Sequence, residues 1–177
     1  MIQVENRILI NGEDFKLIMN EFELTSTLNH HHQFAIHTIL DIEQTLKLKG
    51  VEMIGKDIHI DIQEKNHVDN IWKFKGIICS IESSKNNGVR ALIIRGYSHT
   101  KVMDYVSSFR TFTDSSLDNV VSSIVNRYQQ NNFPELIIRG AKNKLDWIVQ
   151  LQKTDFKQLL FLASKYNPMN VPENLKY

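Results

Sequence analysis

The clearest strand pattern in the sequence is Asp57-Ile58-His59-Ile60-Asp61-Ile62-Gln63, in which apolar and polar residues alternate without interruption. Because successive side chains of a β-strand point to opposite faces, the three isoleucines share one face and the polar residues share the other. A strand of this kind is typical of an antiparallel sheet that covers a core with one face and meets solvent with the other. We therefore expect Ile58, Ile60 and Ile62 to be interior residues.

Strand and turn signals continue on both sides of this stretch. The further strand candidates are residues 7–10, 15–18, 22–25, 34–40, 71–83 and 89–97. Two turns, Asn11-Gly12 and Asn86-Asn87-Gly88, are strong hairpin signals because Asn and Gly tolerate the positive φ of tight turns. Several short strands joined by tight turns favour a small antiparallel β-barrel. We expect residues 1–112 to form this barrel, with Ile78 and Ile93 also inside it.

The pattern changes from alternating to helical after residue 112. Between Ser115 and about Gln129, apolar residues recur at helical spacing and form a stripe one helix face wide. The stripe consists of Leu117, Val120, Val121, Ile124 and Val125. Ser115 and Asp118 stand three residues apart at its start, as the residues of a capping box do. We expect this helix to pack against the barrel as a cover, because its stripe is too short for a stable coiled coil.

Residues 113–167 are predicted to form a helix-strand-helix extension of the same module. Two strand candidates, 136–139 and 147–151, follow the first helix, and a second helix begins at Thr154-Asp155. Residues 168–177 show no periodicity and are expected to be a loosely ordered tail. The predicted fold class is α+β, mainly β: a small antiparallel β-barrel with one or two packed helices.

Composition and charge exclude several classes of function. The chain has 177 residues, of which 42% are hydrophobic and 23% charged, the profile of a folded globular protein. Lys and Arg total 21 against 20 for Asp and Glu, so the net charge of +1 lacks the basic surplus typical of nucleic-acid binders. The sequence has no signal-peptide pattern and no apolar run of the roughly 20 residues that span a bilayer. We expect a protein made in the cytoplasm, with neither nucleic acid nor membrane as a partner.

Histidine and cysteine are the first candidates for metal binding or catalysis. The run His30-His31-His32, with His37 nearby, indicates a solvated turn more than a metal site, because consecutive strand residues alternate faces and do not converge. Cys79 is the one cysteine, so no internal disulfide can form. It lies in an apolar strand, and we interpret it as core filling and not as a nucleophile.

The polar face of the first strand offers a further candidate. Asp57, His59 and Asp61 share that face, but the same pattern occurs on any solvent-facing strand. The sequence contains no glycine-rich phosphate loop, no nucleophile elbow and no paired metal-binding motif. We therefore expect no catalytic, cofactor-binding or metal site, and no enzymatic activity.

A series of motifs along most of the chain resembles one protein family. The motifs are Leu48-Lys49-Gly50 before a strand, Phe74-Lys75-Gly76-Ile77-Ile78, Leu92-Ile93-Ile94-Arg95-Gly96-Tyr97-Ser98, Ser108-Phe109-Arg110-Thr111-Phe112 before the helix, and Val149-Gln150-Leu151-Gln152-Lys153-Thr154-Asp155-Phe156. The order is similar to that in the hub module of VgrG spike proteins of type VI secretion and of phage late-control proteins. That family has a "Gly-x-apolar" strand, a hairpin, an "aromatic-Arg-x-Phe" segment and a "Val-Gln-Tyr-x-Glu-Thr-Asp-Phe" helix entry. This sequence departs from the last motif at two positions, where Leu151 stands in place of the aromatic residue and Lys153 in place of the Glu.

The resemblance implies a mechanical function and a phage tail-hub-like fold. In this family, three hub modules form a ring that joins the inner tube and baseplate of a contractile injection apparatus to the spike. For this chain the resemblance implies the N-terminal hub barrel, with other copies in a trimer and with inner tube and baseplate proteins as partners. The resemblance implies that the chain is assembled into the apparatus. Whether the chain is also secreted with the apparatus stays open. Whether the chain is a fragment or a short relative also stays open, because the family continues into a second barrel and a spike.

Two other functions remain as alternatives. An oligonucleotide- or oligosaccharide-binding barrel would use Trp72 or exposed Tyr residues as stacking platforms. A metal hydrolase would use Asp57, His59 and Asp61 and would hold its metal tightly.

Overall fold

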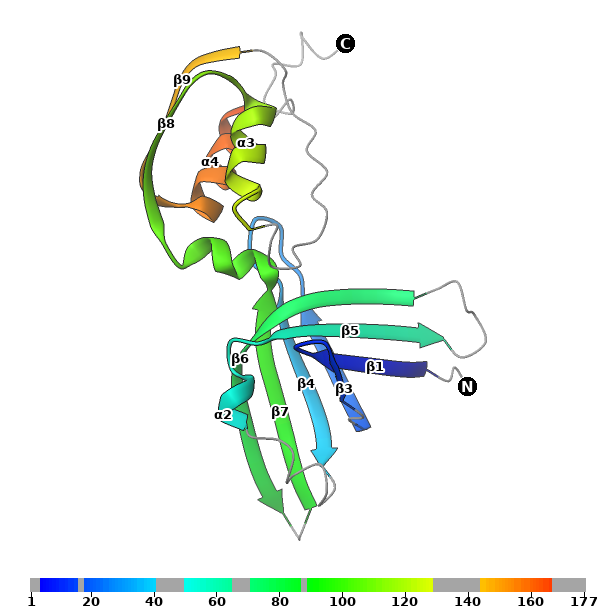
Figure 1. Cartoon of the computed structure of the whole chain (residues 1–177). Coiled ribbons are helices and arrows are strands. Elements are labelled where there is room, and N and C mark those ends of the chain that lie inside the picture. Colours follow the sequence, from blue (N-terminus) through cyan, green and yellow to red (C-terminus); the bar gives the residue numbers. More distant parts are fainter. Residues whose placement is uncertain are drawn as a thin grey trace. The chain divides into compact units, whose positions relative to one another are not determined.

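The computed structural model of the chain describes residues 4–15, 18–40, 50–64, 71–86, 89–128 and 144–166. The chain forms two compact units, Met1–His99 and Thr100–Tyr177 (Figure 1), each with its own hydrophobic core. The boundary that the sequence suggested after Phe112 falls inside strand β8 (Ser107–Ser116), which belongs to the second unit. The expected tail, 168–177, lies outside the described residues.

The first unit is a seven-stranded antiparallel sheet with a short helix, α2 (Gly50–Met53). Its strands are β1 (Val4–Ile10), β2 (Glu13–Phe15), β3 (Ile18–Thr25), β4 (Gln33–Leu40), β5 (Asp57–Glu64), β6 (Ile71–Asn86) and β7 (Val89–Ser98). Their order across the sheet is β2-β1-β5-β6-β7-β4-β3. The Asn11-Gly12 turn joins β1 to β2 with both residues at positive φ, as the hairpin signal predicted.

The prediction of a closed barrel is not confirmed. The sheet ends at β2 on one side and at β3 on the other, and no pairing among the described residues joins these two strands. The sheet is nevertheless strongly curved, since β1 and β5 run across the direction of β4 and β7 (Figure 1). A bulge at Cys79 interrupts the register of the 16-residue strand β6, and bulges of this kind bend a strand. The rings of Phe22 and Trp72, on strands that are not neighbours in the sheet, lie 5.4 Å apart.

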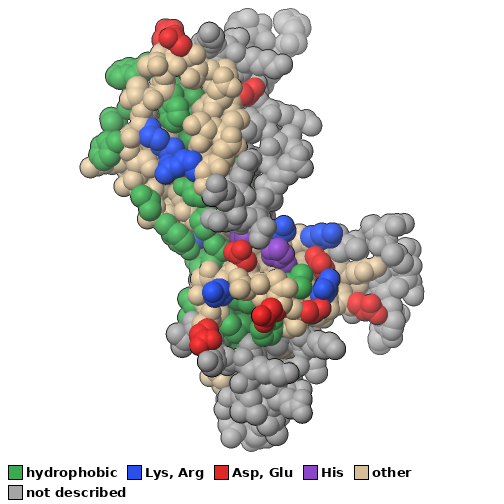
Figure 2. Space-filling view, viewed as in Figure 1, with side chains coloured by type: hydrophobic (Ala, Val, Ile, Leu, Met, Phe, Trp, Pro, Cys, Tyr) green, Lys and Arg blue, Asp and Glu red, His purple; other side chains and the backbone are tan. Residues whose placement is uncertain are grey.

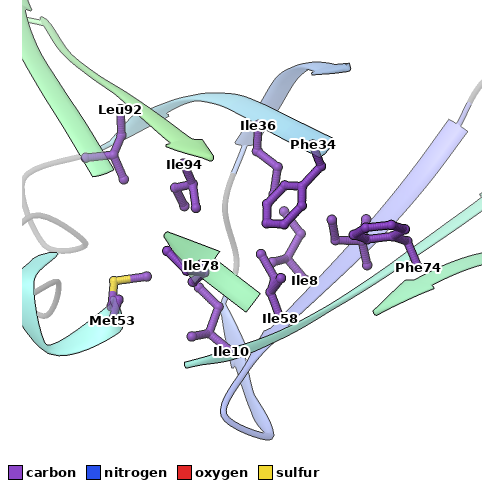
Figure 3. Packing of buried hydrophobic residues seen from close by; sticks show 11 residues of the cluster. Ile8, Ile10, Phe34, Ile36, Met53, Ile58, Phe74, Ile78, Leu92 and Ile94 are labelled. Carbon is purple, nitrogen blue, oxygen red and sulfur yellow. The ribbon is translucent and has the colours of Figure 1, made fainter. Parts of the chain in front are cut away.

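The inner face of this curved sheet carries the first core (Figure 3). Ile58, Ile60 and Ile78 are fully buried, and Ile62 packs at the margin, as predicted. Ile93 is the exception: it is half-buried, and its neighbour Ile94 fills the core instead. The run Leu92-Ile93-Ile94 is apolar in both phases, so alternation could not decide which residues face inward.

Two glycines of the family-like motifs have a steric role in this core. A Cβ atom at Gly96 would lie 2.0 Å from the carbonyl oxygen of Ile77 and 2.6 Å from the ring of Phe34. A Cβ at Gly76 would lie 2.5 Å from the carbonyl oxygen of Tyr97 and 3.0 Å from the same ring. The Phe34 ring therefore packs directly on bare backbone at both positions, which explains why Gly is required there.

The second unit is built from two strands and two helices. They are β8, α3 (Leu117–Val125), β9 (Lys144–Thr154) and α4 (Asp155–Tyr166), with the 3₁₀ helix η1 (His99–Asp104) leading into β8. The stripe of α3 packs on Ile148 of β9 and Leu162 of α4, so its core partners lie in the second unit and not on the predicted barrel. The N-cap of α3 is Ser116 and not Ser115, since the Ser116 side chain accepts a hydrogen bond from the Asn119 amide. The strand candidate 136–139 lies outside the described residues.

Helix length also bears on membranes. Within the described part of the chain, no helix is both long enough and apolar enough to cross a bilayer.

Candidate assembly surface

The two-stranded sheet of the second unit has one face against the helices and one face open to solvent. Along β8 the side chains alternate, so Arg110 and Phe112 point toward the helices while Phe109 points away. On β9, Ile148 and Gln150 are buried, Trp147 and Leu151 on either side of them are exposed, and Val149 between them is half-buried. The sheet therefore has a distinct outer face.

This outer face is largely apolar and, apart from the half-buried Val149, exposed. It consists of Phe109, Thr111, Thr113, Trp147, Val149 and Leu151, and none of these residues is charged. The register pairs Thr111 with Val149 and Thr113 with Trp147. Phe109, Trp147 and Leu151 are 67%, 68% and 63% exposed, which is unusual for large apolar side chains gathered on one face. Figure 2 shows hydrophobic side chains along the side of the second unit where β8 runs.

The strand edges of this sheet are a second feature of the surface. Among the described residues, β8 pairs only with β9, so each strand keeps one edge without a strand partner. An isolated two-stranded ribbon is marginally stable in water, and open edges are templates for pairing with another chain. An apolar face and open edges together are the features of a surface that another subunit covers.

A buried carboxylate fixes this sheet to the helices. Asp155, the first residue of α4, is fully buried and accepts hydrogen bonds from four side chains. Arg110 and Gln150 donate to its Oδ1, the latter at 2.9 Å, while Tyr128 donates to Oδ2 at 2.8 Å and Arg127 at 3.2 Å. Burial, and next the positive charge of Arg127, lowers the pKa of Arg110 below its ordinary value. The network joins β8, β9, α4 and the turn after α3, and it holds the outer face on a rigid support.

The network also explains two of the sequence motifs. The "aromatic-Arg-x-Phe" segment supplies Arg110 and the core residue Phe112, and the helix-entry segment supplies Gln150 and Asp155. Thr154 caps α4 through a hydrogen bond from the Lys157 amide at 3.3 Å. The two motifs are therefore the two sides of one buried interaction.

Among the described residues, His30, His31 and His32 do not belong to any group of three side chains close enough to share a metal ion. His30, His31 and His32 lie in the loop between β3 and β4, where His32 contacts the Ser26 hydroxyl at 3.1 Å and His30 the Leu28 carbonyl at 3.0 Å. The predicted turn is thus confirmed. Cys79 sits half-buried at the bulge of β6, so it is not a core residue as interpreted.

The polar face of β5 is only half-exposed, and it has a partner that the sequence did not reveal. His99 is buried, and its Nε2 lies 3.0 Å from the Gly76 carbonyl oxygen and 3.2 Å from Oδ1 of Asp57. Burial lowers the pKa of His99, and Asp57 opposes the shift. Burial, followed by Lys75, also lowers the pKa of His59. Asp57 on β5 thus binds His99, the residue directly after β7, and its role is structural.

The two tryptophans differ from each other. Trp72 stacks on Phe74 with ring centroids 6.0 Å apart and is 40% exposed. Trp147 instead belongs to the outer face. It pairs with Thr113 of β8, and this register is not visible in the sequence.

The chain combines a curved antiparallel sheet with a helix-covered ribbon, and comparison with solved structures finds phage tail and VgrG proteins of similar fold. The chain is similar to the 43 kDa tail protein of prophage MuSo2 from Shewanella oneidensis, with a TM-score of 0.68 and 13% identity over 92% of this chain and 48% of that one. It is similar to a chain of the Francisella PdpA-VgrG complex, with a TM-score of 0.59 and 14% identity over 93% of this chain and 29% of that one.

A third similar structure relates the phage tail proteins to the type VI secretion proteins. The c3393 protein of E. coli, a component of the type VI secretion system with similarity to the T4 tail proteins gp27 and gp5, matches with a TM-score of 0.58 and 11% identity over 89% of this chain and 42% of that one. No family model matches the chain, and no curated protein matches it. The chain spans less than half the length of these structures. The resemblance to phage tail and VgrG proteins is confirmed as a likeness of fold.

Proposed function

We propose that this chain is a structural hub component of a contractile injection apparatus, of the type VI or phage-derived kind, with no catalytic turnover. It links the inner tube and baseplate to the spike and works by assembling with other subunits. The observation that carries this proposal is the outer face, an exposed and uncharged surface on a rigid ribbon in a chain with a tail-protein fold. Such a face stabilises an assembly because covering it removes apolar surface from water.

Other copies of the hub, in a trimer, are the proposed first partners, with inner tube and baseplate proteins beside them. The tail proteins and VgrG chains of similar fold are about twice as long or longer, so parts of them have no counterpart in this chain. The function of those parts is not carried over.

The proposal is tested by deleting the gene and restoring it in variant forms. Deletion should abolish assembly or firing of the apparatus and leave growth unchanged. The variant F109S/W147S should fail to restore assembly, because it makes the outer face polar without touching the core. The matched control is Leu28→Ser, which removes a large side chain that is 86% exposed in a loop of the first unit. A growth defect with an intact apparatus would refute the assignment.

A nucleic-acid-binding barrel is the competing function, and the outer face gives it a specific basis in the aromatic rings of Phe109 and Trp147. Single-strand binding proteins combine such rings with a basic groove. The outer face has no Lys or Arg, and the whole chain is near neutral. Binding to a single-stranded oligonucleotide at low salt is therefore expected to be absent, and tight binding would favour the competitor.

A further inference from the structure

Three metal-binding side chains meet on the outer side of the first unit's sheet. Glu21 and Glu23 are two residues apart on β3, so their side chains leave the strand on the same face. His37 on β4 pairs directly with Glu21 in the antiparallel register. The side chains that alternate with them, Phe22 and Ile36, pack in the core, which places the three on the side away from it.

A β-bulge produces this arrangement. Met19 pairs with Thr38 and Glu21 pairs with His37, so Asn20 is an extra residue in β3. The bulge reverses the alternation of the strand, and Met19 therefore packs on the core while Glu21 does not. Bulges are known to re-aim side chains next to functional sites, which is their effect here.

The distances are close to those of a coordinated ion. One donor atom from each residue lies within 4.8 Å of the other two, and Nε2 of His37 is 4.0 Å from Oε1 of Glu23. Donor atoms of a tetrahedral zinc site with bonds of about 2.1 Å lie about 3.4 Å apart. A shift of about 1.4 Å closes the largest gap, and rotation within the long glutamate side chains supplies it without backbone movement.

We propose that Glu21, Glu23 and His37 form a three-ligand site for Zn²⁺ or a similar first-row divalent ion, with water in the remaining position. Two carboxylate oxygens and one imidazole nitrogen are a donor set that such ions accept. The ion also balances the two neighbouring negative charges. Arg95 of β7, which pairs in register with Ala35 of β4, forms its ion pair with Glu82.

The bound ion would connect the end strand of the sheet to its neighbour. Within the described ranges, β3 pairs with β4 alone and forms one end of the strand order. A ligand that binds only the folded state raises its stability by mass action, so zinc should protect this edge. The inference concerns the first unit and does not depend on the proposed function.

The test is calorimetric titration of the untagged full chain with Zn²⁺ alone at about pH 7.5, with thermal unfolding as a second readout. We expect one ion per chain and a higher melting temperature with zinc. His37→Asn and Glu23→Gln should each weaken the affinity at least about tenfold.

The matched control is His30→Asn, which removes a histidine from the neighbouring loop and should leave the affinity unchanged. Because Glu23 is 61% exposed and His37 32% exposed at the side chain, the variants should unfold at the wild-type temperature without zinc. Equal zinc affinity in wild type, H37N and E23Q would mean adventitious surface binding only and would overturn the proposal. A loss of binding in H30N but not in H37N would also overturn it.

Discussion

Individual buried residues determine how each unit resists unfolding. In the first unit the interior is purely apolar around Ile58, Ile60 and Ile78, which have no accessible surface. Near its end, His99 introduces one buried imidazole beside Asp57. Two predictions at this scale follow, one from an apolar position and one from the histidine.

Ile60→Asp should destabilise the first unit by more than about 3 kcal/mol, because a carboxylate would be buried among hydrocarbon side chains with no counter-charge. Urea denaturation followed by circular dichroism measures the free energy of unfolding. Leu28→Asp, at a position 86% exposed, is the control and should change it by less than about 0.5 kcal/mol. Similar values for the two variants would contradict the assignment of Ile60 to the core.

The stability should also fall as the solution becomes acidic. Burial lowers the pKa of both His59 and His99 in the folded state, whereas an unfolded histidine has a pKa of about 6.5. Below about pH 6.5 the unfolded chain therefore binds more protons than the folded chain. The contribution of the two neutral histidines to the free energy of unfolding is lost as the pH falls through their folded pKa values. The melting temperature should drop between about pH 7.5 and 5.5, and the drop should be smaller in His99→Asn. An equal drop in the variant would contradict this account.

At the scale of elements, Asp155 is the point at which β8, β9 and α4 are joined. Asp155→Asn keeps the shape but removes the charge that both Arg110 and Arg127 use. Breaking such a buried pair should cost about 3 kcal/mol. Arg127→Gln should cost less than about 1 kcal/mol, because the Arg127 side chain is 50% exposed. Free energies of unfolding in urea compare the two, and an equal loss would show that Asp155 is not the central group.

Elements were predictable from the sequence where one phase of the pattern was unambiguous. The alternation at Asp57–Gln63 identified β5, and the helical stripe identified α3. Ile93 was placed wrongly because a run of three apolar residues fits either phase. The prediction of a closed barrel was also not confirmed. Closure requires pairing between the two end strands of the sheet, and this pairing depends on tertiary curvature and not on local pattern.

The functional surfaces were less accessible to sequence reasoning, for two physical reasons. Aromatic residues within strands are usually packed, so the position of Trp147 in a strand gave no indication that it is exposed. Glu21, Glu23 and His37 meet only because a bulge and a cross-strand register bring them together. Neither the bulge nor the register is visible in one strand alone.

At the scale of the whole molecule, the fold is similar to part of phage tail and VgrG proteins, and we propose a ring of copies. The complete protein in its assembled state should therefore have a mass that is a multiple of three subunits, measured by sedimentation equilibrium. F109S/W147S should shift the mass toward the single subunit, while Leu28→Ser should not. A stable dimer unaffected by the outer-face variant would speak against this arrangement.

The most direct test of the central claim is to place a photo-activated cross-linking amino acid at position 147 in cells that build the apparatus. Trp147 is exposed in the chain and should be covered after assembly. We predict efficient cross-links to another copy of the hub or to a tube or baseplate protein, and few from the same amino acid at position 28. If position 147 remains free of cross-links in an assembled apparatus that contains the protein, the outer face is not the assembly surface and the account is wrong.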